Sequence, residues 1–221
     1  MNRREELEQN LNQIRGDLPA DVTLIVVTKT FPTSDAKLLY ELGVRDFGEN
    51  RDSEGATKSA ELAEDANWHF QGGIQSNKLR SIISWADYIH SLDDLSHARK
   101  IDLLSEELKL RPKVFLQINL DDFSDGSKNP QRSGVAPSEL IAFASELAKF
   151  RNFETVGVMG VAPLGADPAP AFERLANLSQ DLQAIIPTAG SISAGMSGDY
   201  RIALQFGATH IRLGSSILGS R

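Results

Sequence analysis

Lys29 is the residue of this sequence whose position most strongly suggests chemistry. It stands at the end of 22–27 (VTLIVV), an apolar run typical of a strand buried on both faces of a parallel sheet. The carboxyl ends of such strands carry the active-site loops. Partial burial there would lower the pKa of the amine and leave it neutral, as Schiff-base chemistry with an aldehyde or ketone requires. The alternative without chemistry is a lysine whose stem covers the sheet rim while its ammonium reaches water.

Two glycine-serine segments near the end of the sequence could bind an anion. They are Gly195-Met-Ser-Gly198 and Arg212-Leu-Gly-Ser-Ser216. In the first, the Ser197 hydroxyl and backbone N–H groups precede a helix expected near Asp199. In the second, Gly214 permits close backbone approach, and Ser215 and Ser216 offer donors. Loops after strands seven and eight form the usual phosphate site of a βα barrel, although each segment alone could be a plain turn.

Several other kinds of site lack support. The chain has no cysteine, which excludes disulfides, thiolate metal sites and a cysteine nucleophile. The histidines show no metal-ligand spacing, so no metal site is expected; they are His69, His90, His97 and His210. Walker, GxGxxG and GxSxG motifs are absent, which removes the usual support for nucleotide binding and for an α/β hydrolase.

Strand and helix signals alternate along the chain. The expected strands are 22–27, 45–48, 68–71, 88–90, 113–119, 155–161, 191–194 and 210–213. The expected helices are 3–15, 36–42 with Ser34 as its N-cap, 52–64, 79–84, 93–108, one ending at 150, 169–186 and 200–206. With 221 residues, this pattern favours one βα-barrel domain over 1–221, with an additional N-terminal helix. A doubly wound open sheet would show the same alternation.

Composition and charge narrow the function further. The chain is 41% hydrophobic and 24% charged, as in ordinary globular proteins. Its formal charge of −7, without a basic stripe, argues against nucleic acid as a partner. The longest apolar run, 24–27, is far too short to span a bilayer, and the polar start lacks a signal-peptide pattern. We therefore expect a cytoplasmic protein with no membrane partner.

Six ordered motifs together resemble one protein family. They are Val26-Val-Thr-Lys-Thr30, Phe47-Gly-Glu-Asn50, Trp68-His-Phe70 leading to Gln75-Ser-Asn-Lys78, Gly157-Val-Met159, Gly195-Met-Ser197 and Arg212-Leu-Gly214. This set is similar to the single-domain pyridoxal-phosphate homeostasis proteins, the YggS/PROSC family. The resemblance implies an α/β fold, a modified TIM (β/α)8 barrel of fold type III like the N-terminal domain of alanine racemase. It also implies pyridoxal 5′-phosphate (PLP) as the cofactor.

The same resemblance assigns site residues. It implies PLP held as a Schiff base on Lys29, and Arg212 facing the pyridine nitrogen. The remaining cofactor-binding residues that it implies are Asn50 beside the cofactor, Ser197, Gly214 and Ser215 around the phosphate, and His69, Met159 and Met196 along the pocket. The chain departs from the family at Gln71, usually apolar, at Gly73, often proline, and at 121–132, a longer loop leading into Arg132-Ser-Gly134. These departures concern loop conformation rather than cofactor binding.

An arginine at the ring nitrogen bears on function, because a guanidinium only donates and leaves that nitrogen unprotonated. The ring is then a weaker electron sink. Racemases of this fold type add a tyrosine from a further C-terminal domain, and none of Tyr40, Tyr88 or Tyr200 belongs to one. The resemblance thus favours a PLP carrier or regulator of vitamin B6 and amino-acid homeostasis. We expect no robust turnover, a monomer, and apo forms of PLP enzymes as acceptors.

Two enzymatic alternatives stay open. A slow amino-acid racemase would use Lys29, with water or His69 as its partner. A Schiff-base aldolase acting on a sugar phosphate would use the same lysine and phosphate loops without a cofactor. A colourless protein that does not bind added PLP would favour the aldolase.

Overall fold

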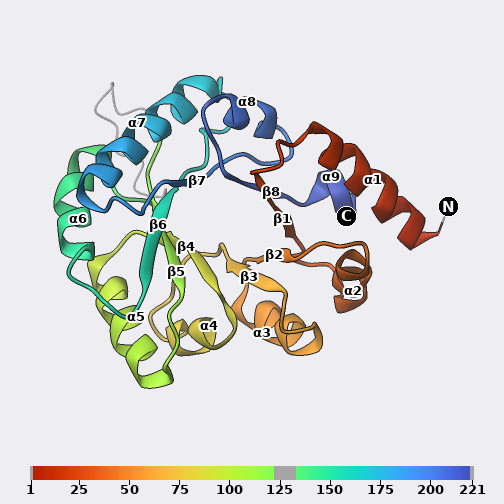
Figure 1. Ribbon diagram of the computed structural model, residues 1–221, viewed down its shortest axis with the longest axis horizontal. Helices are drawn as coiled ribbons and strands as arrows, with labels where there is room; N and C mark the ends of the chain where they lie inside the picture. Colours follow the sequence, from red (N-terminus) through yellow and green to blue (C-terminus); the bar gives the residue numbers. More distant parts are fainter. Residues whose placement is uncertain (1, 122–132, 220–221) are drawn as a thin grey trace.

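Eight parallel strands close into a barrel in the computed structural model, which describes residues 2–121 and 133–219 (Figure 1). The strands are β1 Thr23–Val27, β2 Asp46–Glu49, β3 Asn67–Phe70, β4 Tyr88–Leu92, β5 Lys113–Gln117, β6 Glu154–Met159, β7 Ser191–Ser193 and β8 His210–Leu213. They pair in chain order, and β1 also pairs with β8, with Thr23 opposite His210. This closure confirms the βα barrel and excludes the open sheet.

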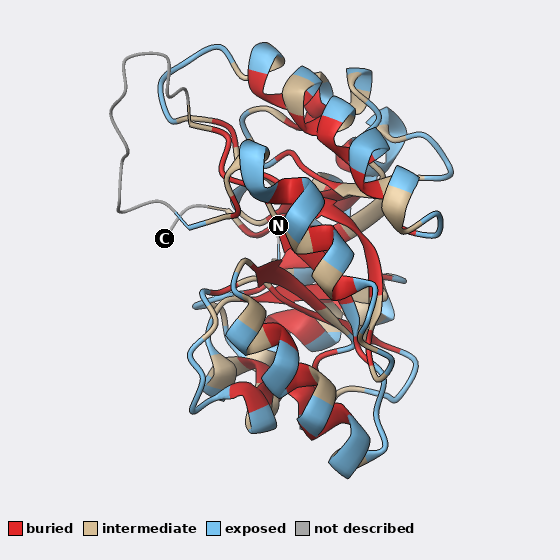
Figure 2. Cartoon of the chain, turned by 90° about the vertical axis from the view of Figure 1, so that its left-hand side faces the viewer, coloured by how far each residue is buried: buried red, intermediate tan, exposed pale blue. Residues whose placement is uncertain are grey.

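Helices surround the barrel and bury their inner faces against it (Figures 1 and 2). They are α1 Arg3–Asp17, α2 Thr33–Glu41, α3 Asp52–Glu61, α4 Leu79–Trp85, α5 Leu95–Leu108, α6 Leu140–Leu147, α7 Ala169–Ile185, α8 Tyr200–Gln205 and α9 Ser215–Leu218, with the short 3₁₀ helix η1 Pro137–Glu139 before α6. Strand side chains alternate between two layers of core. On β5, Val114 and Leu116 join the large cluster between sheet and helices, whereas Phe115 joins a small inner cluster with Val156 and Met159.

The expected additional N-terminal helix is α1. The Asn2 side chain caps it in a capping box with Glu5. Its inner face buries residues at helical spacing: Leu7, Leu11 and Ile14. It packs against α9, where Asn10 Nδ2 donates to the Ile217 carbonyl at 3.0 Å. The two ends of the described chain therefore lie side by side (Figure 1).

Several boundaries differ from the sequence-based expectation. Helix α2 begins at Thr33 after Pro32, so Ser34 lies in its first turn and does not cap it. Strand β1 ends at Val27, two residues before Lys29. Helix α9 is too short, at four residues, to produce a periodic signal. The expected longer loop spans 121–132, and all of it except residue 121 lies outside the described residues. This includes Arg132, the first residue of the Arg132-Ser-Gly134 match. No helix in the described ranges has the length and hydropathy of a membrane span.

Candidate functional site

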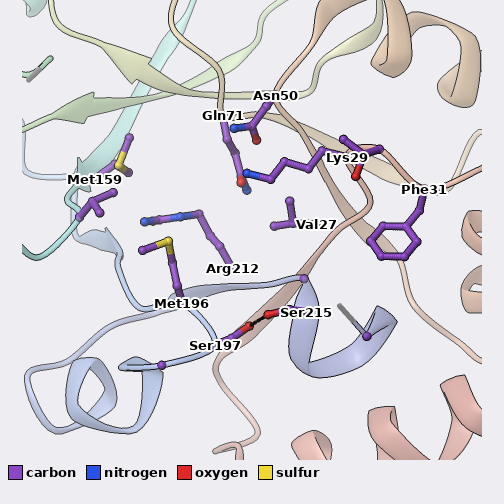
Figure 3. Close-up of a pocket in the computed structure, with 15 residues that line it drawn as sticks. Val27, Lys29, Phe31, Asn50, Gln71, Met159, Met196, Ser197, Arg212 and Ser215 are labelled. Atoms are coloured by element: carbon purple, nitrogen blue, oxygen red, sulfur yellow. Dashed lines mark hydrogen bonds between the residues drawn. The ribbon is translucent and has the colours of Figure 1, made fainter. Parts of the chain in front are cut away.

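A cavity of about 490 Å³ opens at the carboxyl ends of the strands (Figure 3). Its lining comes from the last residues of β1, β6 and β8 and from the segments that follow β1, β2, β3, β6, β7 and β8: Val27, Lys29, Thr30, Phe31, Asn50, Gln71, Met159, Val161, Met196, Ser197, Gly198, Arg212, Gly214, Ser215 and Gly219. This is the end of a βα barrel at which catalytic and binding residues collect. The cavity brings together all the predicted site residues except His69.

The Lys29 side chain extends from the end of β1 into the cavity (Figure 3). It is exposed rather than partly buried, so the expected desolvation of the amine is not present in this structure. Its position toward the cavity, rather than burial, supports a chemical role for Lys29.

A buried ion pair behind β1 holds the residue that precedes Lys29. Lys58 of α3 is 4% exposed and donates from Nζ to the Thr28 carbonyl at 2.8 Å and to Glu49 Oε1 at 2.6 Å. The Thr28 hydroxyl donates to the same carboxylate oxygen at 2.6 Å. Glu49 is 0% exposed, and its Oε2 has no partner within the described residues. Burial raises the pKa of Glu49, against the opposing effect of Lys58.

The residue after Lys29 is held by the same helix. Thr30 has φ +67°, a left-handed conformation that β-branched residues rarely adopt. Its N–H donates to Glu54 Oε2 at 2.7 Å, and Glu54 belongs to α3. Helix α3 thus fixes the backbone on both sides of Lys29, at a strained position of the kind found around functional sites.

Three serine side chains meet on the opposite side of the cavity. Ser197 Oγ lies 3.1 Å from Ser216 Oγ and accepts from Ser215 Oγ at 3.2 Å. The Ser216 N–H also points at Ser197 Oγ, at 3.4 Å. A Cβ at Gly214 would lie 3.2 Å from the Val27 carbonyl oxygen, so a larger residue would press on β1. Hydroxyl and backbone N–H donors around one small volume are suited to an anion.

Arg212 places a positive charge on the cavity floor, 6% exposed. Its Nη1 donates to Ser193 Oγ at 2.7 Å and its Nη2 to the Gly160 carbonyl at 3.1 Å. Burial lowers its pKa to about 10. Within the described residues no carboxylate forms a salt bridge with this guanidinium. A buried cation in this state favours a ligand that brings an anion or a lone pair.

Asn50 and Gln71 follow the ends of β2 and β3 and lie next to Lys29 in Figure 3. Gln71 Nε2 is buried without a hydrogen-bond partner in the described structure. Gly48 makes room for this amide, since a Cβ there would lie 2.8 Å from Gln71 Nε2. A buried amide donor at a cavity wall is costly unless a ligand accepts from it. In the sequence Gln71 stands out only as a departure from the family, but its place directly after β3 is the same kind of signal that identifies Lys29 and Asn50 at strand ends.

His69 is the one predicted site residue that the structure does not place among the residues lining the cavity. It lies within β3, is 0% exposed, and its ring stacks on Tyr88 at 4.3 Å. Its nitrogens lie 2.9 Å from His90 Nε2 and 3.1 Å from Asp46 Oδ1. Because its strand position is below the cavity floor, its ring fills the barrel interior instead. Met159 and Met196, by contrast, flank the cavity beside Arg212 (Figure 3).

The described residues hold no group of His, Cys, Asp or Glu side chains arranged as metal ligands. Around the cavity they offer an amine, an anion-binding set of serines and a buried guanidinium. This combination suits a small molecule with an electrophilic carbon at one end and a phosphate at the other.

Comparisons with known proteins identify relatives of this sequence and of this fold. A family profile described as "Alanine racemase, N-terminal domain" matches residues 3–221. A pyridoxal phosphate homeostasis protein of Synechocystis sp. is 38% identical, over 95% of this chain and 96% of its own. The structure of PipY from Synechococcus elongatus with PLP bound is 34% identical, with a TM-score of 0.88 over 96% of this chain and 100% of that one. Alanine racemase of Clostridium difficile, 18% identical, shares the fold with a TM-score of 0.79 over 98% of this chain and 57% of its own.

Proposed function

Because the chain belongs to the family of pyridoxal phosphate homeostasis proteins, we propose that it binds PLP as a Schiff base on Lys29. We propose further that it serves PLP and amino-acid homeostasis in the cytoplasm, without robust turnover of its own. The observation that carries the proposal is the single cavity that joins Lys29 to the serine cluster and to Arg212.

The residues present fit PLP. When bound, PLP supplies an aldehyde carbon, a phosphate dianion and a ring nitrogen that accepts a hydrogen bond. In the described structure the Gln71 amide nitrogen has no acceptor, and the buried guanidinium of Arg212 carries more N–H donors than its two hydrogen bonds, to Ser193 and to Gly160, use. Such a ligand would provide acceptors for both groups. The space kept free by Gly214 lies beside the converging serines. The cavity volume of about 490 Å³ lies in the range of small-molecule sites.

Each group then has one task. The Lys29 amine would hold the aldehyde carbon as a Schiff base, with the aldehyde oxygen lost as water, and Ser197 with the Ser215 and Ser216 donors would bind the phosphate. Arg212 donates toward the ring nitrogen and, because its guanidinium holds its own protons, leaves that nitrogen unprotonated. Asn50 binds beside the ring, and Met159 and Met196 provide apolar contact along the wall.

The same cavity argues against efficient racemisation, which needs proton donors on both faces of a substrate carbon. Among the described residues that line it, only Lys29 and Arg212 carry titratable side chains. His69 lies outside it, so the racemase alternative loses the partner suggested for Lys29. We therefore favour a monomeric PLP carrier or regulator whose acceptors are apo forms of PLP enzymes. PLP bound to the purified protein would also exclude the cofactor-free aldolase.

Borohydride reduction tests the assignment. Reduction of the PLP-loaded protein, followed by peptide mass spectrometry, should place the PLP adduct on Lys29. Lys29→Ala should give no adduct. Lys78→Ala, which removes a lysine with a 51% exposed side chain on the neighbouring loop, should behave like the wild type. An adduct on Lys78 in the wild type would overturn the proposal.

A further inference from the structure

A continuous chain of hydrogen-bonding side chains runs through the barrel interior. It begins at the cavity, at the carboxyl ends of the strands, and ends at Asp46, at the amino end of β2. Arg212 Nη1 donates to Ser193 Oγ at 2.7 Å, and Ser193 Oγ lies 2.9 Å from His90 Nδ1. His90 Nε2 lies 2.9 Å from His69 Nδ1, and His69 Nε2 lies 3.1 Å from Asp46 Oδ1. The first four groups are buried, whereas the Asp46 side chain, at the start of β2, is 22% exposed.

The route of this chain is set by the topology of the barrel. Arg212 and Ser193 lie on the neighbouring strands β8 and β7, and His90, His69 and Asp46 lie on the neighbouring strands β4, β3 and β2. The bond between Ser193 and His90 therefore spans the interior and joins two sides of the barrel. Residues far apart in the sequence, 103 positions for this pair, meet only because the sheet closes.

The two end groups, Asp46 and Arg212, determine which atom donates in each hydrogen bond of this series. An ionised Asp46 only accepts, so a neutral His69 donates from Nε2 and accepts at Nδ1. His90 then donates from Nε2 and accepts the Ser193 hydroxyl proton at Nδ1. The Ser193 oxygen is left to accept from Arg212, which can only donate. With both imidazoles neutral, every proton in the chain points away from the cavity.

The surroundings keep both imidazoles neutral. The His69 ring stacks on Tyr88 at 4.3 Å, and the His90 ring stacks on Phe115 at 4.4 Å. Burial lowers the pKa of His69 and lowers that of His90 well below its ordinary value. The Arg212 charge adds to the effect on His90.

We propose that Ser193, His90, His69 and Asp46 are positioning residues, which hold the Arg212 guanidinium against the ring of the bound cofactor. The inference rests on the proposed function, because that function places Arg212 at the ring nitrogen. Ser193 is one of the two acceptors recorded for the guanidinium, the Gly160 carbonyl being the other. A hydroxyl that gives its own proton to His90 is a stronger acceptor for Arg212, because successive hydrogen bonds polarise one another. This series of hydrogen bonds therefore fixes the plane of the Arg212 guanidinium from the barrel interior.

The first test determines the tautomers of the two imidazoles and needs no cofactor. Long-range proton–nitrogen NMR spectra of ¹⁵N-histidine-labelled protein report the tautomer and charge of each imidazole. His69→Gln and His90→Gln assign the two signals by their loss. Both should be neutral with the proton on Nε2 at pH 7. A proton on Nδ1 of His90, or a doubly protonated ring at either position, would overturn the chain even if PLP binds normally.

The second test reads the effect on the ligand. Ser193→Ala removes one of the two acceptors of Arg212 and leaves the Gly160 carbonyl. The variant should lower the affinity for PLP about tenfold and shift the absorption maximum of the bound PLP. Ser193→Thr, which restores a hydroxyl, should recover both. Ser179→Ala is the matched control, because it removes an equally buried hydroxyl that has no partner among the described residues. It should change neither quantity.

The outcomes separate the two claims. Wild-type protein that does not bind PLP overturns the proposed function and, with it, the role of the chain at the ring. Wild-type protein that binds PLP, with a Ser193→Ala variant of unchanged affinity and spectrum, overturns only the positioning role. If Ser193→Ala does not fold, the tautomers of the wild type and the spectrum of PLP bound to His90→Gln decide. An unchanged spectrum in that variant contradicts the proposal.

Discussion

Replacing Lys58 by methionine should destabilise the protein strongly, because it leaves the Glu49 carboxylate buried without its cation. Glu49 is 0% exposed, and its Oε1 receives Lys58 Nζ and the Thr28 hydroxyl, both at 2.6 Å. After Lys58→Met only the hydroxyl remains. Breaking a buried pair in this way costs about 3 to 5 kcal/mol, a large part of the roughly 5 to 15 kcal/mol that stabilises a typical domain.

Urea unfolding at pH 7, followed by circular dichroism, measures this loss. Lys37→Met is the matched control, because its ammonium pairs with Glu61 at 2.8 Å while both side chains are about half exposed, at 50% and 45%. That substitution should cost less than about 1 kcal/mol. The double variant Glu49→Met with Lys58→Met removes both charges and should recover most of the loss, since apolar pairs replace buried ion pairs at little cost.

The stability lost in Lys58→Met should also depend on pH. Burial raises the pKa of Glu49 above its ordinary value of 4.5, and removal of Lys58 should raise it further. When a carboxyl has a higher pKa in the folded state than in the unfolded state, it does not lower the free energy of unfolding at pH values below its unfolded-state pKa. The destabilisation grows as pH rises from there through the folded-state pKa. The difference between Lys58→Met and wild type should therefore shrink as pH falls from 7 toward about 4.5. A loss no larger than that of Lys37→Met, or one independent of pH, would refute the reasoning.

Three further results are expected. Ser197→Ala should weaken PLP binding in equilibrium dialysis roughly ten- to a hundred-fold, from about 1.5 to 3 kcal/mol for a charged hydrogen bond, and exposed Ser145→Ala should not; equal affinities would contradict the serine cradle. Burial lowers the pKa of His210 to about 4 and also lowers those of His69 and His90, so the unfolded chain binds more protons below 6.5. Stability in urea should then fall between pH 6.5 and 4 by up to about 1.4 kcal/mol per pH unit for each histidine, and a flat profile would contradict their neutrality. Incubation with L-alanine in deuterium oxide should give no α-proton exchange beyond that of free PLP, whereas turnover of about 1 s⁻¹ would support the racemase.

The barrel was predictable from sequence because its strands are buried on both faces. An apolar run such as Val22–Val27 has few other interpretations when a helical pattern follows it. The closing strand was predicted with its observed bounds, His210–Leu213. Helix ends were less predictable where two signals compete. Ser34 is a good N-cap type, but Pro32 has a backbone that can begin the helix two residues earlier.

Most of the cavity could also be predicted, because its polar residues stand at or shortly after the carboxyl ends of strands. Asn50 directly follows β2, Lys29 lies just beyond β1, and Arg212 lies within the last residues of β8. His69 shows the limit of this rule. Alternation along β3 points its ring inward, but the depth of an inward residue depends on the register of neighbouring strands, in which His69 stands opposite Gly48 and Tyr88. The sequence does not contain that register.

Lys58 could not be found from sequence because its burial depends on tertiary packing. Its helix, Asp52–Glu61, is polar and has the composition of a solvated face. A small residue, Gly55, lets that helix approach α4 closely: a Cβ there would lie 2.3 Å from the Trp85 ring. Lys58, on the same helix, lies at the back of β1 and β2, where Glu49 is its counter-ion. No local pattern distinguishes such a lysine from an exposed one.

Two buried polar networks stand behind the cavity, one at the backbone next to Lys29 and the other at the guanidinium of Arg212. The Lys58–Glu49 pair lies between helix and sheet and holds the backbone next to Lys29. The chain that begins at Ser193 lies inside the barrel and holds the guanidinium of Arg212. Buried charges are weak contributors to stability compared with apolar residues of the same size, so their presence at these two points needs another reason. If that reason is the placement of the amine and the guanidinium, apolar replacement of a whole network should leave the barrel folded and yet reduce its affinity for PLP.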